Sequence, residues 1–372
     1  MKIYYKTIFL FILMPIFGLS QSSYYSNPFS SSLYLNPSNA AVVGESKSLR
    51  IAGNYRYMNY SGEGHIDSRY IEVVSEIASL NTKNSKVKAS IGGYLNQNVQ
   101  GIGKLKNTEG VGIFSILLPL SDNKKMKKPN YDKSSYINFG MGGGFYSRSV
   151  DLSNLIFNDM IVSGSPNSTI SNNFDQNRRI FGDGNFGLTY GLKFDSGVNI
   201  HKISIGGAIY NLNRNGKLSN LRGRFENGFF RVSVPIMYDY IKIEGNYISY
   251  RWRGFFNNFH QGTYRQSELG SLFSWGLKST NDKFPKDTFL DLQLSYRRVI
   301  PFFNNIDFTA NYLVIGLGFS NHHGLSCGMS FDQQLNTNQK ISSGFNSVYE
   351  FYIKKKIKKS NKSIDKLSCQ DF

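Results

Sequence analysis

Apolar and polar residues alternate over unusually long stretches of this chain. In residues 185–195, NFGLTYGLKFD, every second residue from Phe186 to Phe194 is apolar, and 229–240, 268–278 and 289–297 repeat the pattern. Successive side chains of a strand point to opposite faces, so each stretch forms one apolar and one polar face. Strands of soluble sandwiches have about five or six residues, whereas runs of about ten residues can cross a bilayer at a tilt. The alternation therefore predicts a transmembrane antiparallel β-barrel.

The composition agrees with many strands joined by turns. The chain has 36 Gly, 29 Phe and 24 Tyr in 372 residues, and its mean hydropathy of −0.33 argues against a helical membrane protein. The polar face is rich in Gly, Ser, Asn, Lys and Arg, as expected of a wet lumen. Tyr and Trp cluster near the ends of several stretches, for example at 247–252, which is typical of the aromatic girdles at the membrane interfaces.

About fourteen strands are expected, and an even number would place both termini on the periplasmic side. The longest gap, 150–183, is expected at the cell surface, and the lysine-rich loop 121–135 falls on the periplasmic side. The expected strands are 48–59, 68–78, 86–97, 110–120, 135–149, 184–195, 200–212, 228–240, 241–252, 267–278, 287–299, 306–318, 323–332 and 343–354.

Two segments precede the first expected strand. Residues 1–20 have a positive start and an apolar stretch too short to span a bilayer, which predicts a cleaved export signal. Residues 21–47 form a pre-barrel segment, in which Asn36-Pro37 has turn chemistry and Pro blocks strand pairing. The small residues that follow, including Ala41, could pack inside a lumen. We expect 36–46 to be shielded inside the barrel, which spans 48–354, or at its periplasmic mouth.

Residues 355–372 form a basic tail that is expected to lie in the periplasm. Seven lysines lie between Lys354 and Lys366. The tail is interpreted either as a solvated end or as a docking segment for an acidic or peptidoglycan-associated partner. The candidate docking residues are Lys354, Lys355, Lys356, Lys358, Lys359, Cys369 and Phe372.

No residue pattern indicates catalysis, a cofactor or a metal site. The sequence has no metalloprotease, hydrolase or phosphate-loop motif. His322 and His323 are adjacent, so in a strand they would point to opposite faces and could not easily share an ion. GDGNFG (182–187) is interpreted as a turn into a strand, and GMGGG (140–144) as small residues within one. We expect a protein that is not an enzyme.

The chain carries a net charge of +18. Such a charge often indicates nucleic acid, but an exported protein rarely meets it, so no nucleic-acid partner is expected. Acidic partners, lipid phosphates or an anion-selective lumen fit better, and outer-membrane lipid is expected around the barrel.

Several motifs together resemble the PorP/SprF family of outer-membrane proteins, which accompanies the type IX secretion system of Bacteroidota. The opening motif of that family corresponds to Asn36-Pro37 with Ala41, and its Tyr-Arg strand to Tyr55-Arg56. Its penultimate strand carries a motif matched by Ser330-Phe331-Asp332, and its last strand one matched by Tyr349-Glu350-Phe351. Its Cys-Pro-basic-Phe tail is matched loosely by Cys369-Gln370-Asp371-Phe372. Ala41 stands where the family has Gly, and Gln370 where it usually has Pro.

The resemblance implies a barrel whose opening segment packs into or beneath the pore. It also implies an outer-membrane component that handles or anchors a type IX client, such as a gliding adhesin, or joins a periplasmic lipoprotein complex. A general porin or transporter with a basic lumen favouring anions is the alternative.

Overall fold

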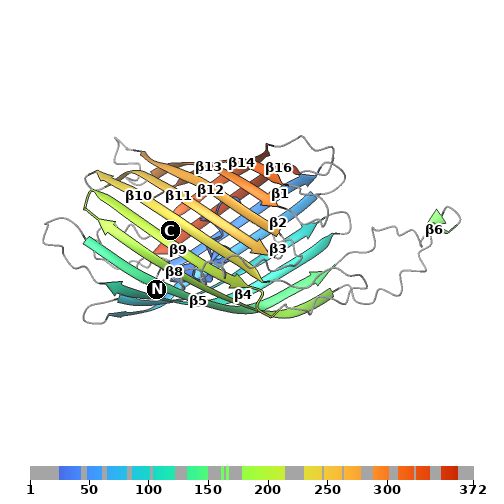
Figure 1. Ribbon diagram of the computed structural model, residues 1–372, viewed down its shortest axis with the longest axis horizontal. Helices are drawn as coiled ribbons and strands as arrows, with labels where there is room; N and C mark the ends of the chain where they lie inside the picture. The colour runs from blue at the N-terminus through green and yellow to red at the C-terminus, as the bar shows by residue number, and fades with distance from the viewer. Residues whose placement is uncertain are drawn as a thin grey trace, which may run out of the picture.

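The computed structural model describes residues 25–42, 48–60, 65–81, 86–100, 104–121, 132–149, 161–162, 165–166, 178–213, 230–244, 247–261, 264–277, 288–300, 309–321, 324–335 and 345–358. Fourteen long strands form one closed antiparallel barrel, in which β1 pairs with β16 to close the ring (Figure 1). Two short strands, β6 (Ile161–Val162) and β7 (Ser165–Pro166), form a separate hairpin. Among the described residues, no helix is both long and apolar enough to cross a membrane.

The barrel strands follow one another around the ring in chain order. They are β1 (Ser48–Tyr60), β2 (His65–Asn81), β3 (Lys86–Gln100), β4 (Leu105–Ser121), β5 (Asp132–Ser149), β8 (Arg178–Asp195), β9 (Asn199–Tyr210), β10 (Arg231–Glu244), β11 (Tyr247–Gln261), β12 (Tyr264–Leu277), β13 (Thr288–Ile300), β14 (Ala310–Ser320), β15 (Leu325–Gln334) and β16 (Phe345–Lys358).

Each of the fourteen predicted segments overlaps one of these strands, so the predicted barrel is confirmed. Most strands begin or end a few residues away from the predicted bounds, and two of these differences change an interpretation. β8 begins at Arg178, so residues 182–187 lie inside a strand rather than in a turn leading into one. β16 continues to Lys358, so 355–358 belong to the barrel and not to the tail. The reason is that Ser48–Ile51 of β1 offer backbone partners to Lys355–Lys358 whatever side chains these residues carry.

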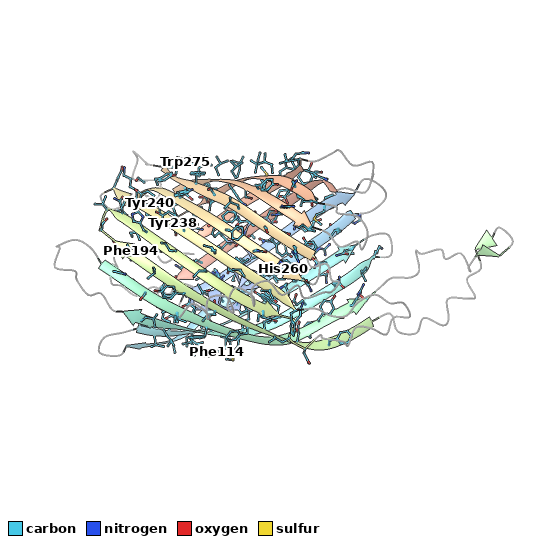
Figure 2. The ribbon with its side chains drawn as sticks, viewed as in Figure 1. Phe114, Phe194, Tyr238, Tyr240, His260 and Trp275 are labelled. Carbon is cyan, nitrogen blue, oxygen red and sulfur yellow. The ribbon has the colours of Figure 1, made fainter. Side chains whose placement is uncertain are left out.

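The outer face of the barrel is apolar. Its exposed side chains include Ile71, Ile91, Met141, Ile205, Leu294 and Phe351. Figure 2 shows Phe194, Tyr238, Tyr240 and Trp275 near one end of the barrel. Tyr238 also packs edge-on against Trp252, with 5.4 Å between the ring centroids. An apolar belt with interfacial aromatic side chains is the surface that a bilayer requires.

The two ends of the barrel differ in which strand ends and connecting segments lie there. We call the end where β1 begins and β16 ends the proximal end, and the other the distal end. The segment 122–131 joins β4 to β5 at the proximal end, whereas 150–177, which contains β6 and β7, joins β5 to β8 at the distal end. Lumen-facing positions alternate with outer ones along every strand, as in β1, where Arg50, Ala52 and Asn54 are buried.

Residues 25–42 lie inside the lumen and are called the plug. They contain a short helix, α2 (Ser32–Leu35), and a 3₁₀ helix, η1 (Pro37–Val42). η1 contacts β2, β3, β4, β5 and β8. The protein core is therefore the interface between the plug and the inner wall of the barrel.

Candidate functional site

The plug is an uncharged segment in a charged lumen. Residues 25–42 contain no Asp, Glu, Lys, Arg or His. Leu33, Asn36 and Ala40 are each 0% exposed to solvent. Every ionic group in this site therefore comes from the barrel wall, and the plug meets it with backbone and neutral polar groups.

Two wall carboxylates hold the first residues of the plug. Glu350 accepts hydrogen bonds from the backbone N–H groups of Ser26 and Asn27, the second at 3.1 Å. Asp332 accepts the Ser26 hydroxyl at 2.9 and 3.0 Å from its two oxygens. The Ser26 carbonyl oxygen in turn accepts a bond of 2.8 Å from the Gln293 amide. Hydrogen bonds to an ionised acceptor are stronger than neutral ones, so these contacts fix the start of the plug.

Arginines balance the charge of these carboxylates. Asp332 lies 2.7 Å from the Arg297 guanidinium and 3.4 Å from that of Arg56, and Arg297 also pairs with Glu268 at 3.2 Å. All of these side chains are nearly fully buried. We call this group, which is Arg56, Glu268, Arg297, Asp332 and Glu350, the charged clamp. Removing one partner of a buried ion pair leaves an uncompensated charge, so the members of the clamp depend on one another.

A further carboxylate, Glu72 of β2, holds α2. It accepts the Leu33 backbone N–H at 3.0 Å, the Ser32 hydroxyl at 3.2 Å and the Tyr70 hydroxyl at 2.6 Å. The Arg50 guanidinium pairs with Glu72 at 3.1 Å and donates to the Ser32 hydroxyl at 2.6 Å. Glu72 thus satisfies a backbone donor of α2 that has no partner within so short a helix.

Aromatic rings surround the middle of the plug. The Tyr34 ring lies within 6.1 Å of Tyr25, Tyr70 and Tyr94, measured between centroids. The Arg231 guanidinium lies 3.9 Å from the centre of the Tyr34 ring and 3.7 Å from that of Tyr210, which is cation–π geometry. It also donates to the Tyr34 carbonyl at 3.3 Å.

Tyr25 closes this cluster at the start of the plug. Its hydroxyl donates to the Asn96 side chain at 2.7 Å. Burial raises the pKa of Tyr25 well above its usual value, because the phenolate would lose its hydration. Tyr25 therefore remains a neutral donor at physiological pH.

Three glycines receive the Asn36-Pro37-Ser38 turn. A Cβ atom on Gly140 would lie 2.4 Å from the Ser38 nitrogen, one on Gly187 2.2 Å from Asn36 Oδ1, and one on Gly206 2.7 Å from Asn36 Nδ2. We call Gly140, Gly187 and Gly206 the glycine seat. Only a residue without a side chain allows the plug backbone to approach the wall this closely.

Hydrogen bonds complete the seat. The Asn36 amide donates to the Leu188 carbonyl and the Thr189 hydroxyl, both at 3.1 Å. Its oxygen accepts the Ser38 backbone N–H at 2.9 Å, as in an Asx turn. Ser115 donates to the Ser38 carbonyl at 3.1 Å.

The structure brings most of the residues of the family resemblance together. Arg56, Asp332 and Glu350 all belong to the clamp, and Asn36, Pro37 and Ala41 lie in the plug. Tyr55 is separate from them, because it faces outward and its hydroxyl donates to Asp67 at 3.0 Å.

The predicted docking residues fall into two groups, those within β16 and those outside the described residues. Lys354, Lys355, Lys356 and Lys358 pair with β1 as part of β16, which corrects the assignment of the last three to the tail. Lys359, Cys369 and Phe372 lie outside the described residues, as do His322 and His323. No group of three or more metal-binding side chains occurs in the described part of the chain.

Sequence reasoning missed Glu72, Glu268, Arg297 and the glycine seat. Glu268 and Arg297 have a detectable signal, since each falls on the polar positions of an alternating strand, whereas Glu72 shares its face of β2 with Tyr70 and Val74. The glycines have a weaker signal; Gly140, for example, belongs to GMGGG, which looks like any stretch of small residues until the plug is placed against it.

The chain matches a known protein family. The model of a family described as type IX secretion system membrane protein PorP/SprF matches residues 18–354. No curated protein matches the sequence.

Among solved structures, a Pseudomonas aeruginosa FadL homologue is similar with a TM-score of 0.46 and 8% identity, covering 91% of this chain and 99% of that one. CdiB from Acinetobacter baumannii has a TM-score of 0.40 and 8% identity, over 84% of this chain and 60% of CdiB. The COG4313 outer membrane channel from Pseudomonas putida F1 has a TM-score of 0.35 and 12% identity, over 84% of this chain and 97% of that one.

Proposed function

This chain belongs to the PorP/SprF family of type IX secretion system membrane proteins, and from that premise we propose that it is a plugged accessory barrel of that system. In this role it handles or anchors a secreted client, such as a cell-surface adhesin used in gliding, or joins a periplasmic lipoprotein partner. Both termini, and with them the proximal end, face the periplasm. The barrel acts by binding and positioning, and catalyses no reaction.

One observation carries the proposal. The side chains that match the family motifs, Arg56, Asp332 and Glu350, are used to hold the plug across the lumen. A general porin needs a water-filled path through the barrel. Here the buried charged groups of the wall bind a neutral plug that occupies the lumen, which opposes such a path. The arrangement therefore favours a structural role in secretion over solute uptake.

Purification of the tagged full-length barrel from native membranes tests the proposal. A stoichiometric protein partner is expected, together with low conductance in planar bilayers. A matched preparation of Glu244→Gln, whose side chain lies on the outer face near the proximal end, should retain the same partner.

The porin alternative predicts the reverse result. Steady anion conductance by the intact barrel, with no protein retained, would overturn the proposed role. Normal export of all clients in a strain lacking the barrel would overturn it as well.

A further inference from the structure

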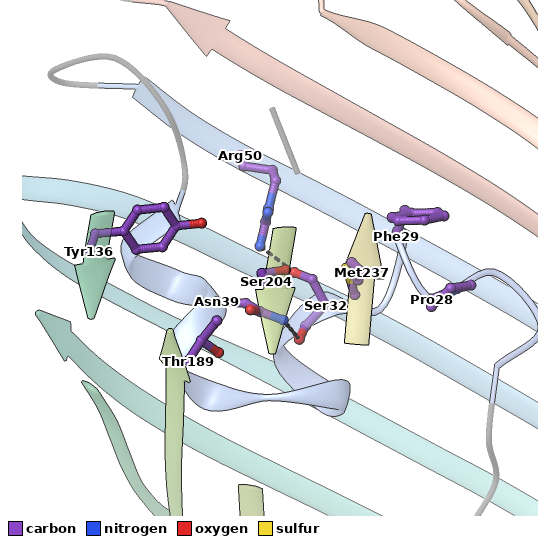
Figure 3. A pocket seen from close by; sticks show the side chains of 9 residues that line it. All are labelled: Pro28, Phe29, Ser32, Asn39, Arg50, Tyr136, Thr189, Ser204 and Met237. Atoms are coloured by element: carbon purple, nitrogen blue, oxygen red, sulfur yellow. Dashed lines mark hydrogen bonds between the residues drawn. The ribbon is translucent and has the colours of Figure 1, made fainter. Parts of the chain in front are cut away.

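The hollow beside the plug is too small for a ligand. It has a volume of about 20 Å³, and Figure 3 shows the side chains that line it, among them Ser32 and Arg50. Such a volume holds about one water molecule. Any larger ligand has to bind elsewhere, and the outer face of the barrel presents exposed charged side chains.

Two exposed arginines lie on the outer face at the distal end. Arg265 is the second residue of β12, and Arg298 is the third residue from the end of β13. Arg265 lies opposite Ile300, and Arg298 lies opposite Ser267, so the two arginines are diagonal neighbours on one face. Diagonal neighbours in a sheet lie about 7–8 Å apart. Both guanidinium groups can therefore reach one small anion between them.

Among the residues that the structure describes, the outward positions around these arginines hold no acidic side chain. In register across the distal ends of β11 to β14, these positions are Asn258, His260, Arg265, Ser267, Arg298 and Asn311. Figure 2 shows His260 toward the end of the barrel away from Trp275. The side chains at these positions are neutral or basic, so they leave the positive charge of the two arginines available to a ligand.

The two arginines lie where the apolar belt of the barrel ends. One row nearer the middle of the strands, Leu269 lies opposite Tyr296, and these outward side chains are 63% and 44% exposed. Cations on the lipid face of a barrel are costly at the bilayer midplane and are tolerated near the interface. The guanidinium groups therefore lie at the depth of the lipid headgroups, and the belt beside them lies at the depth of the acyl chains.

We infer that Arg265 and Arg298 bind the phosphate of a membrane lipid that has a phosphomonoester headgroup. Such a phosphate carries a charge of about −1.5 to −2 and has three acceptor oxygens. Two guanidinium groups match that charge, and their planar arrays of N–H donors fit phosphate oxygens. The acyl chains lie over Leu269 and Tyr296. In the orientation proposed above, this lipid belongs to the leaflet at the cell surface.

Arg69 of β2 provides a matched comparison at the same end of the barrel. It is exposed and faces outward, but Asp67 occupies the next outward position of the same strand. The Asp67 carboxylate lies 3.0 Å from the Tyr55 hydroxyl and 3.7 Å from His65 Nε2. A carboxylate at this position repels a phosphate, so Arg69 is not expected to bind one.

Native mass spectrometry of the purified full-length protein in detergent tests the inference. Dioleoyl phosphatidic acid is the probe, and dioleoylglycerol is its counterpart without the phosphate. We expect phosphatidic acid to bind at least about fivefold more tightly than dioleoylglycerol. Arg265→Gln and Arg298→Gln should each lower the affinity for phosphatidic acid about fivefold, whereas Arg69→Gln should change it less than about twofold.

Three outcomes would overturn the inference. Equal binding of the two lipids would indicate contact with acyl chains alone, and an equal loss in Arg69→Gln would mean that any exposed cation suffices. Displacement of the lipid by inorganic phosphate in excess would indicate a site for the free anion.

A conservative variant separates loss of charge from damage to the fold. Arg298→Lys keeps the charge and should lose less affinity than Arg298→Gln, and equal losses would contradict the role of charge. Heat-modifiable mobility on gels checks that each variant is folded. The assay contains no secretion partner, so its result is independent of the partner and export measurements that test the proposed function.

Discussion

Two of the places where the wall holds the plug use different chemistry. At Ser26 and Asn27 the wall supplies full charges, and the clamp neutralises them with buried arginines. At Asn36 and Ser38 the wall supplies no charge, and the glycine seat supplies space instead. The clamp therefore depends on the identity of a few charged groups, whereas the seat depends on the absence of side chains.

This difference has a consequence for how each contact fails. A buried ion pair that loses one partner leaves a charge without compensation. A seat that gains a methyl group is overpacked, and the cost depends on how far neighbouring atoms can move. The following variants separate the two modes, from the largest expected effect to the smallest.

Asp332→Ala should destabilise the barrel most. It removes the carboxylate that forms the ion pair with Arg56 and leaves Arg297 paired with Glu268 alone, and the loss should be about 3–5 kcal/mol of unfolding free energy. Urea unfolding followed by tryptophan fluorescence measures it. A loss below that of the seat variants would show that the clamp is not the stronger contact.

Gly187→Ala should cost about 1–3 kcal/mol, because the new Cβ atom would overlap Asn36 Oδ1 and Pro37. A Ser38→Cys reporter should also react faster with a maleimide in this background. Gly207→Ala is the matched control, since a Cβ atom there meets nothing within 4 Å. Equal labelling rates in the two variants would contradict the proposed seat.

Ser115→Ala tests the seat without adding bulk. It removes the hydroxyl that donates to the Ser38 carbonyl, and about 1 kcal/mol should be lost. The same urea titration measures it. A loss as large as that of Asp332→Ala would mean that hydrogen bonding, rather than space, dominates at the seat.

Glu244→Gln should have the smallest effect. The Lys242–Glu244 pair is 2.9 Å long, but its side chains are 46% and 47% exposed. Such a pair contributes no more than about 1 kcal/mol. A larger loss would show that the outer rim of the barrel is more strongly coupled to the fold than its exposure indicates.

The strands could be predicted from the sequence because alternation is local. The apolar residues from Phe186 to Phe194 can be assigned to one face of a strand from their alternation with their immediate neighbours, so no distant residue is needed. The end of β16 could not be found this way, because residues Lys355 to Lys358 are kept in the sheet by backbone bonds to β1 and not by an apolar face.

The site was partly predictable for a similar reason. Asp332 and Glu350 stood out through the family resemblance, and Asn36-Pro37 through its turn chemistry. Glu72 and Gly187 acquire a role only when the plug lies beside them, which requires the closed ring. A contact between residues far apart in the chain leaves no local pattern to detect.

That separation also sets an order of events during assembly. Ser26 is gripped by Glu350, 324 positions later in the chain, and by Asp332. The N-terminal segment is synthesised before the strands that hold it, and contacts this distant form slowly. The plug can reach its native surroundings only once β15 and β16, which carry Asp332 and Glu350, are in place. A lumen with the plug in its native contacts therefore indicates that the barrel has been completed.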